Sequence, residues 1–324
     1  MFTVVIPLFN KALSIQRALD SVFAQTFPPA QIIVVNDGST DGSDKIAKAQ
    51  SDARIRVIDQ PNRGVSAARN AGIAAASEPF IAFLDADDRW LPGYLEHMKS
   101  VIEKHPGAVM YGAGYRTFKH GRPNGEFGVR AAEPGPVDFF REWSRGHLLH
   151  ACTTVVPKAA AEAVGGFGEN VAYGDDYHFW AKLALSGPVV LSPERMSEYD
   201  MSVPGQIIEY YQTEHTKRFD VFEYQRLLAD ELGRQVASGR GDSSLVAFCR
   251  KDFGLGLLQR LYWSDFAAMR KFCDQLHLEQ LPLGLPVTAC CMVGRHPASW
   301  PLLRPVMALV RCVRGFARNL TARP

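Results

Sequence analysis

The sequence predicts an α/β fold with a mostly parallel central sheet, followed by a mainly helical C-terminal region. Short apolar runs rich in β-branched residues recur in the N-terminal third, each ends at a polar residue, and each is followed by apolar residues at helical spacing. This alternation is typical of repeated βα units, which form a parallel sheet covered by helices. The expected strands are residues 4–9, 32–35, 55–58 and 80–84.

Helices are expected between these strands because apolar residues recur there every three or four positions. Asp41 or Ser43 is a candidate N-cap for the second of them. After the fourth helix the pattern favours one more strand and then a Gly- and Pro-rich surface loop. In chain order, the expected elements are helices over residues 15–23, 43–49, 65–76 and 91–104, a strand over 109–118 and a loop over 121–136.

Polar residues follow all four expected strands, and parallel strands place such residues along one edge of the sheet. In open α/β sheets this edge is where ligands bind. The fourth strand ends in Asp85-Ala86-Asp87-Asp88, with three carboxylates in four residues. Because neighbouring carboxylates repel one another, the cluster predicts a bound cation, and a divalent ion fits it well.

The composition is ordinary for a globular protein. The 324 residues are 47% hydrophobic and 22% charged with a formal net charge of +2, which gives no argument for nucleic-acid binding. The six cysteines form no CxxC pair, which fits free thiols in a reducing cytosol. No secretory signal precedes the first strand, and residues 280–294 are too short for the ~20 residues that a bilayer requires. We expect the protein in the cytoplasm or on the cytoplasmic face of a membrane.

Two nucleotide-binding classes are excluded by their missing motifs. The turn after the first strand, Pro7-Leu8-Phe9-Asn10-Lys11, has no glycine and therefore no GxGxxG dinucleotide-binding fingerprint. No GxxxxGK[ST] phosphate-binding loop occurs anywhere in the sequence.

Four sequence segments stand out in order along the chain: Val4-Val5-Ile6-Pro7-Leu8-Phe9-Asn10, residues 34–41 with Asn36-Asp37-Gly38, residues 62–72 with Asn62-Arg63-Gly64, and Leu84-Asp85-Ala86-Asp87-Asp88. Together they resemble the family 2 glycosyltransferases with the GT-A fold. The resemblance covers about residues 1–200 and implies a catalytic domain over residues 1–205. It implies a metal-dependent, inverting hexosyl transfer from a nucleoside-diphosphate sugar, a UDP-sugar above all, in bacterial cell-envelope polysaccharide synthesis. A non-catalytic member that binds a nucleotide sugar or glycan is the alternative.

The resemblance implies a donor site along the sheet edge. Asp37 would accept a hydrogen bond from the uracil imide, and Phe9 would stack near the base where many relatives have tyrosine. Pro7 and Asn10 would shape and close the same loop, and Asn62 lies in the third matching segment. Arg69 has two open roles, binding the diphosphate or pairing with the aspartate cluster.

Asp85 and Asp87 match the DxD motif of the family, with Ala86 between them. The resemblance implies that they hold Mg²⁺ or Mn²⁺ between carboxylate and diphosphate, since both ions prefer hard oxygen ligands. Asp87 is expected to be the better metal ligand and Asp85 to lie nearer the ribose. Asp88 is open to another role, as the cap of the helix beginning near Leu91.

The catalytic base is expected after Gly165-Gly166-Phe167, where relatives carry an acidic pair at the start of a helix. Here the pair is Asp175-Asp176 instead of the usual Glu-Asp. Asp176 is the expected base and Asp175 the second candidate, although either or both could cap the helix instead.

One family feature is missing, because no histidine lies between His178 and His215. Relatives often have one shortly after the segment that here contains Tyr199. Either the metal site is looser, or His215 substitutes for it. His147 and His150 could face the acceptor, and a polar surface is the simpler interpretation.

The C-terminal region, residues 206–324, is expected to be helical, with helices over 207–235 and 245–275 separated by a break at 238–242. After Glu279 there are no acidic residues, and a basic amphipathic tail follows. It could contact an anionic inner membrane or dock on the domain. A membrane position would suit a lipid-linked saccharide acceptor, and a growing glycan is the alternative. The basic residues of the tail are Arg295, Arg304, Arg311, Arg314, Arg318 and Arg323.

Overall fold

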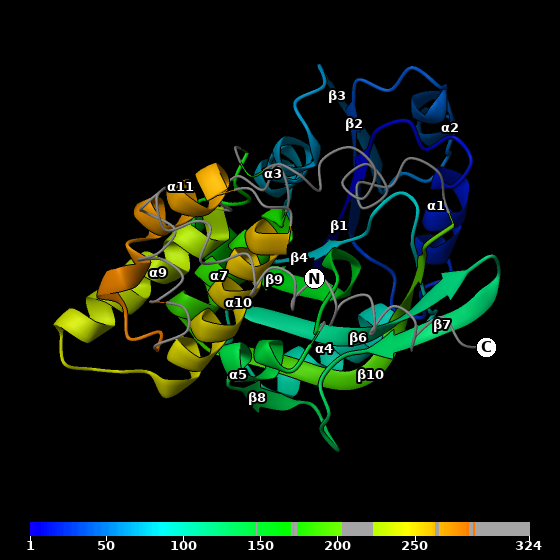
Figure 1. Cartoon of the computed structure of the whole chain (residues 1–324). Coiled ribbons are helices and arrows are strands. Elements are labelled where there is room, and N and C mark those ends of the chain that lie inside the picture. Colours follow the sequence, from blue (N-terminus) through cyan, green and yellow to red (C-terminus); the bar gives the residue numbers. More distant parts are fainter. Residues whose placement is uncertain are drawn as a thin grey trace. The chain divides into compact units, whose positions relative to one another are not determined.

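The computed structural model describes residues 1–146, 148–169, 171, 174–202, 223–262, 266–284 and 288. The chain divides into two compact units, residues 1–206 and residues 207–324 (Figure 1). Among the described residues, no helix is both long and apolar enough to cross a membrane. The predicted basic tail, His147 and His215 lie outside the described residues.

The first unit contains a ten-stranded sheet with the order β3-β2-β1-β4-β9-β6-β10-β5, with β7 beside β6 and β8 beside β10. The strands are β1 (Phe2–Leu8), β2 (Gln31–Asp37), β3 (Ile55–Gln60), β4 (Phe80–Phe83), β5 (Arg89–Trp90), β6 (Met110–Lys119), β7 (Arg122–Phe127), β8 (Gly135–Val137), β9 (Thr154–Pro157) and β10 (Val189–Asp200). The helices are α1 (Ile15–Phe23), α2 (Ser43–Lys48), α3 (Val65–Ala75), α4 (Tyr94–Lys104), α5 (Phe139–Ser144), the 3₁₀ turn η1 (Ala151–Thr153), α6 (Lys158–Ala163) and α7 (Asp175–Ser186).

The N-terminal half of this sheet is parallel, as the alternating pattern predicts. Strand β1 lies between β2 and β4, and β3 pairs with the outer side of β2. The residues of β1 and the apolar centre of β2 are buried on both faces, as in parallel sheets covered by helices on each side. The carboxyl ends of β1, β2 and β4 therefore meet at one edge, with Asn10, Asp37 and Asp85 following them.

Helix α3 packs unusually close to β1 because it carries a glycine at the contact. A Cβ at Gly72 would lie 2.3 Å from a methyl carbon of Val5, so any larger residue would push the helix away from the strand. The close packing brings Arg69, one turn earlier on α3, to the sheet edge.

The other half of the sheet is mixed and corrects one prediction. Strand β9 runs antiparallel to β4 and β6, whereas β6 and β10 are parallel to each other. The expected loop over residues 121–136 instead contains β7 and β8. Strand β7 forms a hairpin with β6 through His120 and Gly121, which both have positive φ, the geometry of a tight type I′ turn.

The helix boundaries also correct three expectations. Gly42, not Asp41 or Ser43, is the N-cap residue of α2, and the Asp41 carboxylate accepts from the backbone N–H of Ser43 beside it. Helix α4 begins at Tyr94 after the short strand β5, with Gly93 at its N-cap. Asp88 therefore does not cap this helix.

The described part of the second unit is helical. Its elements are α9 (Glu223–Ala237), α10 (Ser243–Tyr262), α11 (Phe266–Leu276) and the 3₁₀ turn η2 (Leu278–Gln280). The break at 238–242 lies where it was predicted, but the second predicted helix, over 245–275, is two helices, α10 and α11. The start of the first predicted helix lies outside the described residues. Buried apolar side chains join the three helices, among them Leu228, Leu232, Phe253, Met269 and Phe272.

Candidate active site

The loops after β1 and β2 are tied together by Asn10. Its backbone has positive φ, its side-chain oxygen accepts from the N–H of Thr40 at 2.8 Å, and its own N–H donates to the Ser39 hydroxyl at 3.1 Å. Pro7 is buried within β1, whereas the Phe9 ring is 45% exposed. Asn10 therefore links the two loops at this edge of the sheet, and the Phe9 ring beside it is exposed to solvent.

Asp37 is buried and holds the loop that precedes α3. One carboxylate oxygen accepts from Gln60 Nε2 at 2.7 Å and from the backbone N–H of Arg63 at 2.9 Å, and the other accepts from the N–H of Gly64 at 2.8 Å. Asn62 lies exposed in this loop against Gly38, where a Cβ would be 2.9 Å from the Asn62 nitrogen. Asp37 therefore positions the loop, with both of its oxygens already accepting hydrogen bonds.

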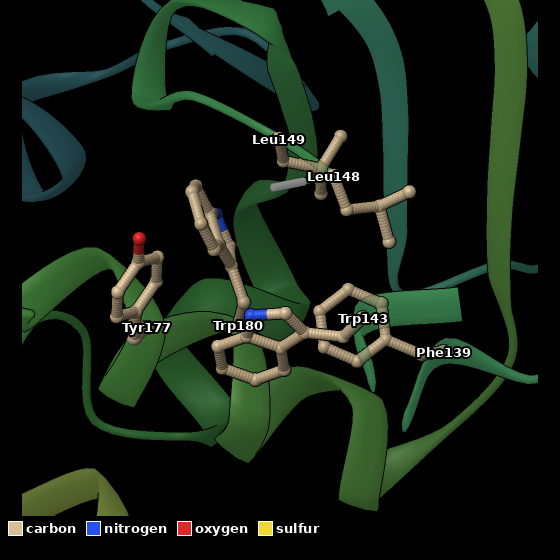
Figure 2. Close-up of a pocket in the computed structure, with 6 residues that line it drawn as sticks. All are labelled: Phe139, Trp143, Leu148, Leu149, Tyr177 and Trp180. Carbon is tan, nitrogen blue, oxygen red and sulfur yellow. The ribbon is translucent and has the colours of Figure 1, made fainter. Parts of the chain in front are cut away.

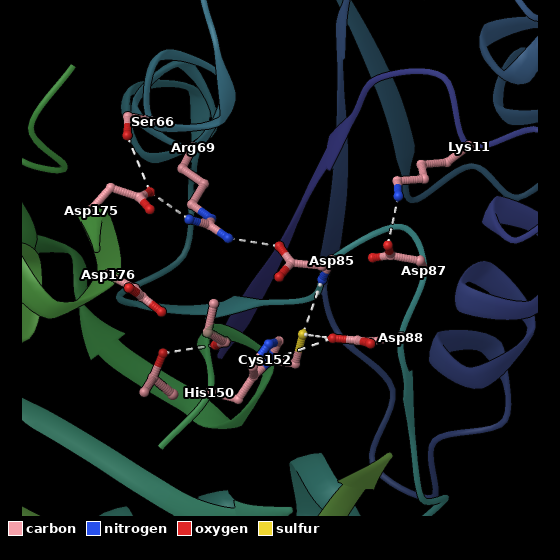
Figure 3. Close-up of polar contacts among 12 residues, drawn as sticks. Lys11, Ser66, Arg69, Asp85, Asp87, Asp88, His150, Cys152, Asp175 and Asp176 are labelled. Carbon is pink, nitrogen blue, oxygen red and sulfur yellow. Dashed lines mark hydrogen bonds and ion pairs between the residues drawn. The ribbon is translucent and has the colours of Figure 1, made fainter. Parts of the chain in front are cut away.

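Arg69 lies between the two acidic segments that the sequence singles out, as Figure 3 shows. Its guanidinium donates to Asp85 Oδ1 at 2.8 Å and to Asp175 Oδ2 at 2.7 Å, and its carbon lies 5.1 Å from the centre of the Phe167 ring. Of its two open roles, the described chain therefore has Arg69 paired with aspartates. Burial alone would lower the pKa of Arg69, but Asp85 and Asp175 outweigh burial and raise it.

The Gly165-Gly166-Phe167 motif is clamped by Asn70 of α3. The amide oxygen of Asn70 accepts from the Phe167 N–H at 2.8 Å, and its amide nitrogen donates to the Phe167 carbonyl at 2.9 Å. Both glycines have positive φ. The Phe167 ring stacks on Phe179 of α7 with centroids 4.1 Å apart, so the motif links the helix of Arg69 to the helix of the acidic pair.

The two acids at the start of α7 differ in their partners. Asp175 accepts from Arg69 and from the Ser66 hydroxyl at 3.1 Å. Asp176 accepts from the backbone N–H of Tyr177 at 2.8 Å. Gly174 is the N-cap, and no side chain caps this helix, so capping does not explain the pair. Burial, and then the negative charge of Asp175, raise the pKa of Asp176 to about 7, against the opposing effect of Arg69.

The segment Asp85-Ala86-Asp87-Asp88 turns its three carboxylates in different directions (Figure 3). Asp85 faces Arg69, and Asp87 Oδ2 lies 2.7 Å from Lys11 Nζ. Asp88 Oδ2 accepts from the Cys152 thiol at 2.7 Å. Burial, then the charges of Asp87 and Asp85, raise the pKa of Asp88 well above its usual range. The buried Ala86 separates the two DxD carboxylates.

His150 joins this cluster from a distant part of the sequence. Its Nδ1 lies 3.4 Å from Asp88 Oδ2, and its ring stacks on Tyr199 with centroids 4.7 Å apart. The polar-surface interpretation of His150 is therefore wrong. Because β9 runs antiparallel to β4, the residues before β9 lie at the end of β4, and the linear motifs gave no sign of this.

Four residues could contribute ligands to a metal ion: Asp85, Asp88, His150 and Cys152, whose candidate ligand atoms lie within 4.8 Å of one another. Asp88 Oδ1 and His150 Nδ1 are buried and have no hydrogen-bond partner among the described residues. Carboxylate and imidazole ligands fit Mn²⁺, and carboxylates fit Mg²⁺. Burial raises the pKa of the Cys152 thiol, so this soft ligand stays protonated. The residues present thus fit a hard divalent ion.

An aromatic wall lies beside the acidic pair (Figure 2). Its side chains line a small hollow with room for about one water molecule, and the Tyr177 ring, next to Asp176, lies 5.3 Å from the Trp143 ring between centroids. The hollow is lined by Phe139, Trp143, Leu148, Leu149, Tyr177 and Trp180.

Comparison with known proteins agrees with this geometry. Residues 3–155 match the family model described as "Glycosyl transferase family 2". That match covers just under half of the chain, and over this segment the chain is similar to glycosyl transferase family 2. The matched segment contains the first, second and fourth strands with Asp37, Arg69 and the DxD residues, whereas Asp175 and Asp176 lie beyond it.

The relatives of this chain share only part of its length. An uncharacterized glycosyltransferase of Rickettsia prowazekii is 28% identical over 191 residues, which cover 56% of this chain and 58% of the relative. Glycosyltransferase GlyA of Streptococcus pneumoniae is 38% identical over 115 residues, 35% of this chain and 16% of the relative. The chain therefore spans less than two thirds of either relative.

A solved structure agrees with the fold over nearly the whole chain. S. aureus TarS residues 1–349, in complex with UDP-GlcNAc, superposes with a TM-score of 0.68 at 20% identity and covers 96% of this chain and 87% of that one. At this identity the likeness shows the fold, which is the predicted GT-A fold.

Proposed function

We propose that this chain is an inverting glycosyltransferase that moves a sugar from a UDP-sugar to a hydroxyl of a glycan or a lipid-linked acceptor in cell-surface polysaccharide synthesis. The observation that carries the proposal is the bridge of Arg69 between Asp85 and Asp175. It couples the DxD segment to the acidic pair, so that donor and base are held in one site.

The donor is assigned to the edge formed by β1, β2 and β4. The exposed Phe9 ring is suited to stack on a base, with Asp37 at the end of the neighbouring strand β2 and Asn62 in the loop before α3. The structure of TarS with UDP-GlcNAc supports a uridine nucleotide.

A divalent Mn²⁺ or Mg²⁺ would be held by Asp85 and Asp87. Asp88 and His150 offer further ligand atoms beside Asp85, in a cluster that does not include Asp87. Once bound, such an ion supplies positive charge to the diphosphate as it leaves. Arg69 and Lys11 add to that effect, because these cations form ion pairs with the carboxylates that would face the diphosphate.

Asp176 is proposed as the base. As the acceptor hydroxyl oxygen forms its bond to the anomeric carbon, the bond from that carbon to the diphosphate oxygen breaks, and the hydroxyl proton passes to Asp176. A pKa of about 7 leaves this carboxylate partly deprotonated near neutral pH and basic enough to accept the proton. Asp175 cannot take this role as readily, because Arg69 and Ser66 occupy its carboxylate.

The acceptor side is assigned to the aromatic wall of Figure 2, because aromatic rings contact the apolar face of sugar rings well. A peripheral contact with the cytoplasmic face of the inner membrane stays a prediction from the basic tail, which lies outside the described residues.

Thermal unfolding in the presence of UDP, dTDP, GDP or CDP, each with and without Mn²⁺, tests the donor assignment. A ligand at ~100 times its dissociation constant adds about 2.7 kcal/mol of stability. We expect UDP with Mn²⁺ to raise the melting temperature most. No shift with any nucleotide would contradict the proposal and favour a role in glycan binding.

A further inference from the structure

Lys11 is the first residue after the loop residue Asn10, and its ammonium group lies on the DxD segment. Its Nζ is 2.7 Å from Asp87 Oδ2, and the two side chains are only 15% and 12% exposed. The carboxylate that the DxD motif would offer to a metal ion is thus already paired with a cation of the protein (Figure 3).

The backbone of Lys11 is fixed, whereas its side chain can turn. The Lys11 carbonyl accepts from the backbone N–H groups of Ser14 and Ile15 at the start of α1, and the next residue, Ala12, donates to Asp41. A lysine side chain has a flexible four-carbon stem, and its ammonium group binds phosphate as a compact positive charge. Lys11 can therefore change partners within the site without any movement of its loop.

Both DxD carboxylates pair with cations of the protein itself, Asp85 with Arg69 and Asp87 with Lys11. A divalent ion that binds Asp87 without a nucleotide must displace the Lys11 ammonium group, which then loses its ion pair. A metal ion that arrives on a nucleoside diphosphate brings phosphate oxygens to which the ammonium group can transfer.

We propose that Lys11 holds Asp87 until the donor binds and then moves to the diphosphate, so that metal ion and nucleotide bind together and not metal first. This inference rests on the proposed donor site. Lys11 acts here as a positioning residue that couples the two ligands, and the coupling is reciprocal.

The test is a Mn²⁺ titration of the full chain without nucleotide, followed by the electron paramagnetic resonance signal of free Mn²⁺. In Lys11→Met, where Asp87 has lost its cation, we expect Mn²⁺ to bind about tenfold more tightly than in the wild type. Lys11→Arg keeps the charge and should match the wild type. Lys99→Met is the control, because it removes a lysine that pairs with Glu103 on α4 and not with the DxD segment.

A second titration at saturating UDP measures the coupling. UDP should tighten Mn²⁺ binding strongly in the wild type and in Lys99→Met, and by a several-fold smaller factor in Lys11→Met, where the diphosphate gains no ammonium partner. Melting temperatures show that each variant is folded, and Lys11→Gln replaces Lys11→Met should the latter unfold.

The two titrations separate this inference from the proposed function. Unchanged or weaker Mn²⁺ binding by folded Lys11→Met would overturn the inference, whatever UDP does. A wild type that binds neither UDP nor Mn²⁺ with UDP would instead contradict the donor proposal, while the titration without nucleotide still decides whether Lys11 competes with the metal ion.

Discussion

Arg69 donates to Asp175 across 2.7 Å and thereby gives two adjacent acids different surroundings. Asp175 is held against a cation, whereas Asp176 keeps a carboxylate whose pKa is raised to about 7. The sequence alone left open which of the two acids is the base. The ion pair of Asp175 with Arg69 supports the proposal that it is Asp176.

Asp176→Asn should abolish most of the activity without weakening the binding of the donor. Removing a general base typically lowers the rate by ~10²- to 10⁴-fold, while the donor contacts at the other end of the site are intact. The readout is the rate of UDP release from a UDP-sugar on which the wild type is active, together with UDP affinity by calorimetry. Asp44→Asn, which removes a partly buried acid on α2 that pairs with Lys48, is the control. Full activity in Asp176→Asn would rule out this base.

The rate should depend on pH through Asp176. Its folded-state pKa lies above the ordinary value of 3.8, and the base works only when deprotonated. We expect kcat/KM to fall about tenfold per pH unit below 7 and to level off above it. In Asp175→Asn the neighbouring negative charge is gone, so the midpoint of the profile should move to lower pH. A midpoint that stays in place would contradict this origin of the pKa shift.

Arg69→Met should destabilise the first unit even without any ligand. The substitution leaves Asp85 and Asp175 without their buried cation, and breaking such a pair typically costs about 3–5 kcal/mol. Arg63→Met is a matched control six residues earlier, because the Arg63 side chain is 59% exposed and its pair with Glu169 should contribute at most about 1 kcal/mol. Urea unfolding measures both, and equal losses would contradict the bridging role.

The family and the fold were predictable because their signals are local. Each β-strand ends at its polar residue within the same short segment, and parallel pairing then brings Asn10, Asp37 and Asp85 to one edge. The structural comparison confirms the predicted GT-A fold. The site residues keep the roles expected of them only as proposals, although the structure brings Asp85, Arg69, Asp175 and Asp176 together as the motifs suggested.

Features that depend on distant pairing were not predictable. His150 and Cys152 reach Asp88 only because β9 pairs antiparallel with β4. Strand β7 was mistaken for a loop because it contains proline and glycine and lies exposed at the sheet edge, where neither residue breaks a central ladder. The turn at His120-Gly121 was the one local signal for this hairpin.

Gly166→Ala should cost more than Gly165→Ala, although both residues have positive φ. That backbone conformation costs either alanine about 1–2 kcal/mol. A Cβ at Gly166 would also lie 2.4 Å from Asn70 Oδ1, whereas one at Gly165 would meet nothing within 4 Å. Asn70 would have to give up its hydrogen bonds to Phe167, at about 1 kcal/mol each.

We therefore expect Gly166→Ala to unfold at a lower urea concentration than Gly165→Ala. Its free energy of unfolding should be lower by about 1–3 kcal/mol. Because Phe167 lies under Arg69 and against α7, the rate of UDP release should also fall in Gly166→Ala and be retained in Gly165→Ala. Adding Asn70→Ala removes the colliding oxygen, so the double variant should lose less stability than the sum of the two single changes. Additive losses would show that Asn70 and Gly166 act independently and that the clamp does not position α7.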